Sequence, residues 1–496
     1  MSRPDLSDEQ RDALLNTSRL SFVESAPGSG KTTVAVERLG VLHHTRSDRL
    51  EPRGIVVVSF ARSAVAELRV RVATRWGSRT LLPPNLVTTM DGLHRRVVEF
   101  LLLTGLVTWP GGVTRPQLID SWARQRGAVR VRAGSRQSQR WEFGMNDTTL
   151  AAAYREVEAP CWGMPYKNRD DWVKSLADGV CSHDEIRQIV GLALGKPQLR
   201  TEIDAYLSRT FHHLIVDESF DLNGLDSLVV RRCIESGMAV TLVGDPWQAL
   251  YEWRGARPDM VHKILTDYSF SIFPISESFR FKSDETVEIA RALRARETVA
   301  IPPATSRPDV VIAAEWDHLP ESGLDVIPLS FGQLDCQTDA AISLLLDVVT
   351  RARLGEPALG QAESIRCLRR DPDTLDLSGV LEALREPAVA LEDVMEQLRA
   401  AAKVDERRKP SLPASRKNSR IARLGLLRRW LRTEMIYVPG LTFHQAKGKE
   451  WHSVDVALDQ SARDSLAKGL DPEKEDHRKI YVGSTRGIMA TRLRPL

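Results

Sequence analysis

The stretch that decides the fold is SFVESAPGSGKTT, residues 21–33. Residues 21–24 predict a short strand, and residues 32–42 carry apolar side chains at helical spacing. Between them lies a glycine-rich turn. A strand, such a turn and a helix in this order are the context of a phosphate-binding loop, where backbone N–H groups and a helix N-terminus face an anion. Lys31 would then place a positive charge on the outer phosphates, and Thr32 would offer a hydroxyl to Mg²⁺.

The predicted cradle has one departure from the usual pattern, because its first small position is Ser25 rather than glycine or alanine. The alternative is a glycine-rich turn with an incidental lysine, which the flanking strand and helix make unfavourable. The residues assigned to the cradle are Ser25, Ala26, Pro27, Gly28, Ser29, Gly30, Lys31, Thr32 and Thr33.

Further apolar runs around this loop predict a parallel sheet. Residues 54–60 hold IVVV and precede a predicted helix from Arg62, and residues 214–216 and 239–243 are two more buried-strand runs. Strands that alternate with helices place their functional side chains at the carboxyl ends of the strands. We therefore predict an α/β chain with a parallel sheet.

The run LIVDE supplies acidic residues at such a strand end. Asp217 would hold the metal and Glu218 would polarise an attacking water. An acidic cap at a strand end is the alternative, and it is common in α/β proteins. The nearby phosphate loop favours the catalytic interpretation.

Size and composition set the remaining bounds. The chain of 496 residues is long enough for several domains, and 42% hydrophobic and 27% charged residues fit a globular protein. A net charge of +3 leaves polyanion binding to local patches. The five cysteines form no CxxC pair, so no zinc or iron–sulfur site is predicted. No apolar run approaches the roughly 20 residues of a membrane span, and residues 1–10 do not read as a secretory signal. We expect a cytoplasmic protein.

Further motifs occur in a fixed order: LSDEQRDAL, VVVSFARSAVAELRVRV, VTTMDGLHRRVV, HHLIVDESFDLN, LVGDPWQALYEWRGA, FPISESFRF, TFHQAKGKEWHSVDV and EDHRKIYVGSTRG. Together with the loop, this series resembles the UvrD, Rep and PcrA helicases of superfamily 1. The resemblance implies two RecA-like motor domains, ATP and Mg²⁺ as cofactors, single-stranded or tailed duplex DNA as substrate, and 3′ to 5′ movement.

The resemblance also implies roles for residues beyond the loop. Gln10 would read adenine and Phe279 would stack on it, while Glu450 would complete the nucleotide site. Gln248 would sense the terminal phosphate, and Arg280 and Arg486 would reach it from the second domain, Arg486 as an arginine finger supported by Arg478. The implied DNA contacts are Phe60, Tyr251, Trp253, Arg254, Thr442 and His444. For Phe60 and Trp253 the alternative is core packing, and for His444 a structural role.

Three residues depart from the pattern of the resembled family. Asp91 stands where the family usually has histidine, Phe220 replaces a glutamine, and Thr33 replaces an arginine that often forms the second face of the adenine site. Phe220 and Thr33 put in doubt the selectivity for the nucleotide base and the tightness of coupling, but neither replaces a residue assigned to hydrolysis.

The expected domain boundaries follow from the motifs. The first motor domain comprises residues 1–95 and 211–272, with an insertion at 96–210 that is helical and has no strong strand. The second comprises residues 273–375 and 436–496, with a short basic insertion at 376–435. Basic stretches at 124–141 and 407–432 would contact DNA phosphates or form solvated faces.

Three functions remain open from the sequence. The first is a translocating helicase. The second is a nucleotide-gated switch that controls a partner nuclease with little unwinding. The third, a non-hydrolysing relic, is disfavoured by the complete set of hydrolysis residues. The compact size and organisation also resemble the helicase subunit of Gabija-type phage-defence systems, which implies a partner endonuclease and an antiviral role.

Overall fold

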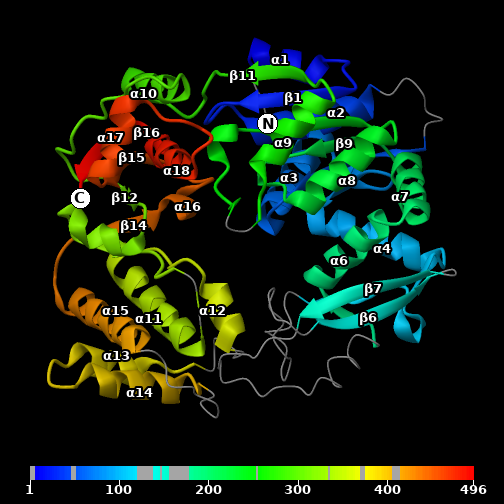
Figure 1. Ribbon diagram of the computed structural model, residues 1–496. Helices are drawn as coiled ribbons and strands as arrows, with labels where there is room; N and C mark the ends of the chain where they lie inside the picture. The colour runs from blue at the N-terminus through cyan, green and yellow to red at the C-terminus, as the bar shows by residue number, and fades with distance from the viewer. Residues whose placement is uncertain are drawn as a thin grey trace.

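The structure, a computed structural model, describes residues 6–45, 52–119, 138–145, 148–155, 178–252, 255–332, 334, 336–368, 375–404 and 414–496. It contains two parallel sheets that lie side by side, each wrapped by helices (Figure 1). We call residues 6–275 the first lobe and residues 276–496 the second lobe. The predicted α/β class with parallel sheets is confirmed.

The first sheet has six parallel strands. In spatial order they are β11 (Ser271–Ile275), β1 (Leu20–Ser25), β10 (Ala239–Gly244), β9 (Phe211–Val216), β2 (Gly54–Ser59) and β3 (Leu86–Thr89). Neighbouring residues of β2 enter different cores, Val56 and Val58 on one face, Ile55 and Val57 on the other. Burial on both faces explains the unbroken IVVV run. The sheet extends to Ile275, past the predicted boundary at residue 272.

Helices cover both faces of this sheet (Figure 1). They are α1 (Asp8–Leu15), α2 (Lys31–His44), α3 (Arg62–Trp76), α4 (Met90–Leu103), α8 (Gly224–Glu235) and α9 (Pro258–Asp267). The strand and helix predicted at residues 21–24 and 32–42 are confirmed as β1 and α2. Helix α1 begins with a capping box, in which Ser7 and Gln10 satisfy each other's backbone N–H groups.

The first insertion contains strands, so the prediction that it lacks them was wrong. Two small sheets are formed by β4 (Val107–Thr108), β5 (Gln117–Ile119), β6 (Ser138–Met145), β7 (Thr148–Arg155) and β8 (Val180–Ser182). The segment also includes α6 (His183–Leu194) and α7 (Pro197–Thr210), which contact α4 and extend the core of the first lobe. Strands β4, β5 and β8 have two or three residues each, which leaves too little alternation for a sequence pattern to reveal them, whereas β6 and β7 have eight residues each and were missed by the prediction.

The second sheet has five parallel strands. In spatial order they are β13 (Val326–Pro328), β14 (Val438–Thr442), β12 (Val310–Ala313), β15 (Trp451–Leu458) and β16 (Gly487–Pro495). The helices around it are α10 (Asp284–Arg294), α16 (Phe443–Ala446), α17 (Gln460–Lys468) and α18 (Glu475–Ser484). Among the described residues, no helix combines the length and apolarity needed to cross a bilayer.

A helical bundle with its own hydrophobic core lies below the second sheet in the view of Figure 1. Its helices are α11 (Gln337–Leu354), α12 (Gln361–Leu368), α13 (Ser378–Arg385), α14 (Leu391–Ala401) and α15 (Ala414–Arg432). The basic helix α15 directs much of its charge inward. Arg420 binds buried Asp339, Arg423 lies over the ring of Trp316, and Arg428 donates to backbone carbonyls of α13 and the following turn. These three arginines therefore hold the bundle together.

Removing the buried arginine of α15 tests this structural role. Arg420→Ala would leave the buried Asp339 carboxylate with the Cys336 thiol at 3.3 Å and a longer contact to Arg423 at 3.7 Å, so we expect a loss of about 3 kcal/mol in the free energy of unfolding. Lys417→Ala on the same helix is the control, because this exposed side chain should change stability by less than about 0.5 kcal/mol. Urea unfolding measures both. Equal stability of the two variants would contradict the assignment.

Phe220, the residue that replaces the family's glutamine, belongs to the core of the first lobe. Its side chain is 2% exposed, and its ring lies 6.0 Å from that of Phe22 and 5.0 Å from that of His262. A Cβ added at Gly244 would approach the same ring to 3.0 Å. An apolar side chain fills this pocket, and a buried amide in its place would cost free energy unless it formed a new hydrogen bond.

Restoring the family's residue should cost stability. We expect Phe220→Gln to lower the free energy of unfolding by about 1–3 kcal/mol, since a polar group enters an apolar pocket. Phe220→Leu keeps the pocket apolar and serves as the matched control. Urea unfolding of both variants measures the difference. If Phe220→Gln proves as stable as Phe220→Leu, the pocket does accommodate a polar side chain.

Candidate nucleotide site between the two lobes

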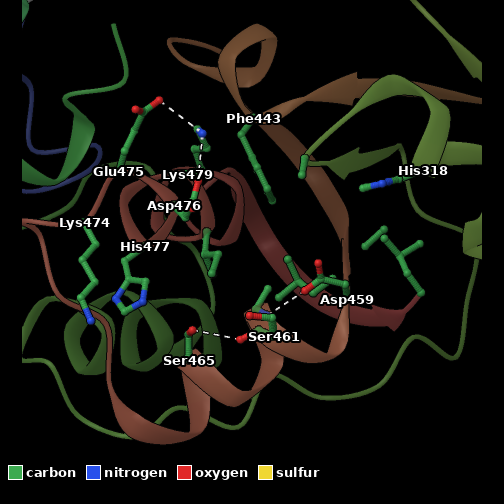
Figure 2. Close-up of a pocket in the computed structure, with 16 residues that line it drawn as sticks. His318, Phe443, Asp459, Ser461, Ser465, Lys474, Glu475, Asp476, His477 and Lys479 are labelled. Atoms are coloured by element: carbon green, nitrogen blue, oxygen red, sulfur yellow. Dashed lines mark hydrogen bonds and ion pairs between the residues drawn. The ribbon is translucent and has the colours of Figure 1, made fainter. Parts of the chain in front are cut away.

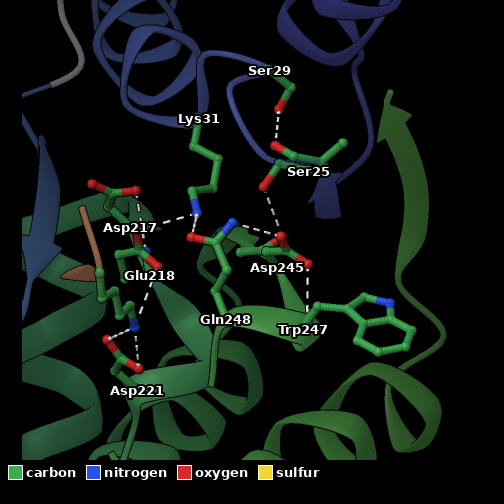
Figure 3. A network of polar contacts seen from close by, with 12 residues as sticks. Ser25, Ser29, Lys31, Asp217, Glu218, Asp221, Asp245, Trp247 and Gln248 are labelled. Carbon is green, nitrogen blue, oxygen red and sulfur yellow. Dashed lines mark hydrogen bonds and ion pairs between the residues drawn. The ribbon is translucent and has the colours of Figure 1, made fainter. Parts of the chain in front are cut away.

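The phosphate loop is held in place by its own backbone and by neighbouring strands. The Ser25 hydroxyl donates to the carbonyl of Gly244 at 2.9 Å, and Ser29 Oγ donates to the carbonyl of Ala26 at 2.8 Å. Ser25 therefore joins the end of β1 to the end of β10, which gives the unusual serine a structural use. Figure 3 shows both serines beside the polar network described below.

Two glycines of the loop adopt backbone conformations that favour glycine. Gly28 has φ of 75° and Gly30 has φ of 82°. A Cβ at Gly28 would lie 2.4 Å from Cβ of Arg280, and one at Gly30 would lie 2.8 Å from Nε2 of Gln10. The loop is thus closely approached by the first lobe's α1 and by the second lobe, and both approaches require glycine.

Three acidic residues gather after β9, at the carboxyl end of the strand. Asp217 is 2% exposed, and Asp221 is also buried. Glu218 lies between them with φ of 56°, a left-handed conformation that costs a non-glycine residue of order 1–3 kcal/mol. Strain of this kind persists where the surrounding structure holds a functional side chain in one direction. The turn is completed by the short helix η4 (Ser219–Asp221).

Two lysines neutralise these acids, one from each lobe. Lys31 Nζ lies 3.3 Å from Glu218 Oε1 and donates to Gln248 Oε1 at 3.1 Å. Lys447, from the second lobe, contacts both oxygens of Asp221 at 2.8 and 2.9 Å and lies 4.0 Å from Glu218. Figure 3 shows Lys31 and the acids converging on one place. The cleft between the lobes is therefore lined by opposite charges in contact.

The charges around the acids move their pKa values apart. Burial and the neighbouring Glu218 raise the pKa of Asp217 to about 7. Burial alone would also raise that of Glu218, but Lys31 and Lys447 hold the pKa of Glu218 at about 2. Glu218 is thus a carboxylate at neutral pH, the form that can accept a proton or a hydrogen bond from water.

The second lobe brings its two arginines to the same cleft. Arg280 Nε lies 2.7 Å from Glu450 Oε2, and its Nη1 donates to the carbonyl of Thr485 at 3.0 Å. Arg486 is completely buried and donates to the carbonyls of Val482 and Lys449. Burial, and then the nearby charge of Arg280, lower the pKa of Arg486 to about 9, and Glu218 acts on it in the opposite direction.

The residues assigned to the adenine have mixed surroundings. Gln10 is buried, and its Nε2 donates to the carbonyl of Ser29 while its Oε1 accepts from the N–H of Ser7. Its amide therefore supports the phosphate loop in this structure. Phe279 is 42% exposed, and its N–H donates to the carbonyl of Gly28 at 3.0 Å. An exposed aromatic ring beside the loop is suited to stacking on a base.

The residues present fit a magnesium–triphosphate group. The loop provides glycines at close approach and a helix N-terminus, Thr32 lies in the first turn of α2, and Asp217 is buried just after β9, which is separated from β1 by β10. Mg²⁺ is commonly held by one or two carboxylates together with substrate phosphates.

The predicted DNA contacts are only partly brought together. Phe60 is half-buried against the core of the first lobe. Tyr251 lies with its ring 4.6 Å from Nζ of Lys447. Thr442 caps α16, and His444 Nε2 lies 3.9 Å from Glu475 Oε1. Trp253 and Arg254 lie outside the described residues, as do the arginines at 124–137. The DNA roles of all these residues stay predictions.

A cavity of about 520 Å³ lies next to this region of the second lobe. Phe443, at the end of β14, and Asp459, at the end of β15, line it together with residues of α17 and α18 (Figure 2). Its lining includes Lys474 and Lys479 but also three acids, and Lys479 pairs with two of them, Glu475 and Asp476. Such mixed charge gives little electrostatic attraction to a phosphate backbone.

Asp91, which replaces the family's histidine, ties the insertion to the first lobe. Its carboxylate lies 2.7 Å from Nε of Arg187 and 3.6 Å from Nδ1 of His183, both on α6. The neighbouring His94 is buried within 3.3 Å of Asp226, and burial lowers the pKa of His94 to about 4. Asp91 therefore has a structural use at the position where the family's histidine would stand.

Two residues of the second lobe make contacts with the first lobe that the sequence does not predict. Lys447 stands in a quoted motif, and its ion pair with Asp221 joins the lobes. Arg478 was expected to support Arg486, but it donates to the carbonyl of Ala249 at 2.7 Å and pairs with Glu252, so it supports the loop that carries Gln248. Their partners lie over 220 residues away in the chain, and the periodicity of the sequence carries no signal for such distant pairs.

Comparison with known proteins places this geometry in context. Residues 6–101 and 145–269 match the family described as UvrD/REP helicase N-terminal domain. DNA helicase II of Salmonella typhimurium is 24% identical over 287 residues, which cover 56% of this chain and 38% of that protein. The Rep helicase of Escherichia coli is 23% identical over 52% of this chain and 39% of its own length. The chain thus matches less than two-fifths of these relatives, and its first lobe is similar to the N-terminal domain of UvrD/REP helicases.

Proposed function

We propose that this protein is an ATP-driven motor on single-stranded DNA, a translocase or helicase of superfamily 1. One observation carries the proposal: residues predicted to act in hydrolysis lie on both sides of the contact between the lobes, where Arg280 approaches Gly28 and Lys447 pairs with Asp221. Lys31, Glu218 and Gln248 come from the first lobe, and Arg280 and Arg486 come from the second. The similarity of the first lobe to DNA helicases supports DNA as the substrate.

Each side chain has a chemical task in this proposal. Lys31 and the loop N–H groups bind the phosphates, and Glu218 orients the attacking water as a carboxylate. Arg280 and Arg486 stabilise the charge that develops on the transferred phosphoryl group. Mg²⁺, held by Thr32 and Asp217, would supply further neutralisation of phosphate charge. Lys31 must leave Glu218 and Gln248 for the phosphates, so binding rearranges the network that joins the lobes.

In this proposal the lobes move relative to each other, because the nucleotide binds in the cleft where the two lobes contact. Lys447 and Arg280 cross it, so a change of charge inside it alters how the lobes contact each other. Aromatic side chains that stack on bases would convert this movement into steps, each stack contributing about 1–3 kcal/mol without sequence preference. Tyr251 is placed for such coupling, because its ring touches Lys447. The 3′ to 5′ direction and a role in phage defence are part of the proposal through resemblance.

A second candidate is a DNA-stimulated NTPase that switches a partner nuclease with little unwinding. The arginines of α15 favour it, because Arg420, Arg423 and Arg428 are engaged inside the bundle and contribute less charge to duplex binding. Both candidates use the same nucleotide site and differ only in what the hydrolysis drives.

Removal of the loop lysine should abolish turnover. We expect Lys31→Ala to lower DNA-stimulated ATP hydrolysis at least about 100-fold, because the charge that holds the outer phosphates is lost. Glu218→Gln should also lose turnover while it still binds ATP. Lys468→Ala, an exposed lysine at the end of α17, is the control and should hydrolyse ATP normally. Retained hydrolysis by Lys31→Ala would defeat the site assignment.

Forked DNA separates the two candidate functions. The helicase proposal predicts strand separation on a duplex with a 3′ single-stranded tail, and not on one with a 5′ tail, at rates that follow ATP turnover. Strand separation is read by fluorescence of a labelled duplex, with Lys31→Ala as the inactive control. Rapid ATP turnover on single strands without strand separation would support the switch and contradict the helicase.

A further inference from the structure

The loop that carries Gln248 is organised by one buried carboxylate. Asp245 is 1% exposed and precedes the short helix η5 (Pro246–Gln248). Its Oδ1 accepts from the N–H of Trp247 at 3.1 Å, and its Oδ2 accepts from Nε2 of Gln248 at 2.7 Å. The amide of Gln248 is therefore fixed with Oε1 toward Lys31 (Figure 3). Asp245 thus sets the orientation of the predicted phosphate sensor.

This carboxylate is balanced by a cation from the other lobe. Arg294, in the last turn of α10, lies with Nη1 3.1 Å from Asp245 Oδ1 and with Nη2 2.9 Å from Glu24 Oε1. The same Nη1 donates to the carbonyl of Ser25, the first residue of the phosphate cradle, at 3.3 Å. One guanidinium from the second lobe therefore touches both the sensor loop and the start of the cradle.

The side chain also sits among other contacts between the lobes. Trp247 stacks on Tyr481 of α18 with ring centroids 4.8 Å apart, and Arg478 donates to the carbonyl of Ala249. These contacts hold the loop in position, and Arg294 forms an ion pair with the carboxylate that orients Gln248. A buried carboxylate that loses its counter-charge is strongly disfavoured.

We propose that Arg294 is a positioning residue that transmits closure of the two lobes to Gln248 through Asp245. When the lobes close, Arg294 fixes Asp245, and Asp245 fixes the amide beside Lys31. When the lobes separate, the carboxylate loses this partner and the amide loses its fixed direction. Hydrolysis is thereby favoured only in the closed arrangement. This inference rests on the proposed ATPase function and adds a residue that the motif pattern did not single out.

Kinetics of the full chain test the inference. For Arg294→Gln, with saturating single-stranded DNA, we expect kcat to fall roughly tenfold while KM for ATP changes less than about twofold, because an interaction needed only for the reacting state is lost. Arg294→Lys keeps the charge and should recover part of the rate. Arg291→Gln is the matched control, since Arg291 lies on the same helix and pairs only with surface acids, Glu288 and Glu297, in the contacts of the described residues.

A double-mutant cycle separates positioning from a structural effect. If Arg294 acts through Gln248, the variant Gln248→Ala with Arg294→Gln should have about the same kcat as Gln248→Ala alone. Thermal unfolding accompanies each variant, and Arg294→Lys supplies the comparison if Arg294→Gln is unstable. Multiplicative losses in the double variant, or a kcat for Arg294→Gln equal to that of Arg291→Gln, would overturn the inference while wild-type hydrolysis still supports the proposed function. Absence of wild-type hydrolysis would overturn both.

Discussion

The structure depends on the neutralisation of the buried acids after β9. Asp217, Glu218 and Asp221 lie within one turn of chain, with Asp217 and Asp221 buried and Glu218 partly exposed, and carboxylates this close repel one another. Lys31 from the first lobe and Lys447 from the second lobe supply the opposing charge. Because half of that charge comes from the other lobe, the acids form part of the candidate site and also join the two lobes.

Other ion pairs between the lobes follow the same pattern, with an acid of the first lobe and a cation of the second. Asp245 is balanced by Arg294, and Glu252 is paired with Arg478, so acids of the first lobe meet cations of the second. A triphosphate would enter as a competing polyanion, and it would draw Lys31 away from Glu218. We propose that binding of nucleotide and rearrangement of the lobes are one electrostatic event, which is the coupling a motor requires.

The sequence predicted the parts of the fold that follow from local pattern. The loop at 25–33 could be predicted because glycine is favoured where the backbone takes a positive φ. The strands β2, β9 and β10 could be predicted because a strand buried on both faces has an unbroken run of apolar residues. The short strands of the first insertion and the inward-facing arginines of α15 were missed. An arginine that binds a buried carboxylate 81 residues away looks the same in sequence as one that faces solvent. Pairs such as Lys447 with Asp221 likewise depend on tertiary distance alone.

The two arginines of the second lobe bear most directly on what the cleft binds. Arg486 is fully buried, its donors go to two backbone carbonyls and to the Thr485 hydroxyl, and burial and then the nearby charge of Arg280 lower its pKa. Two adjacent cations in a site of low polarity oppose each other. An anion placed between them and the phosphate loop relieves that opposition, and Arg280 already touches the loop at Gly28. The charge pattern therefore favours a phosphate-bearing ligand at this place, independently of any motif.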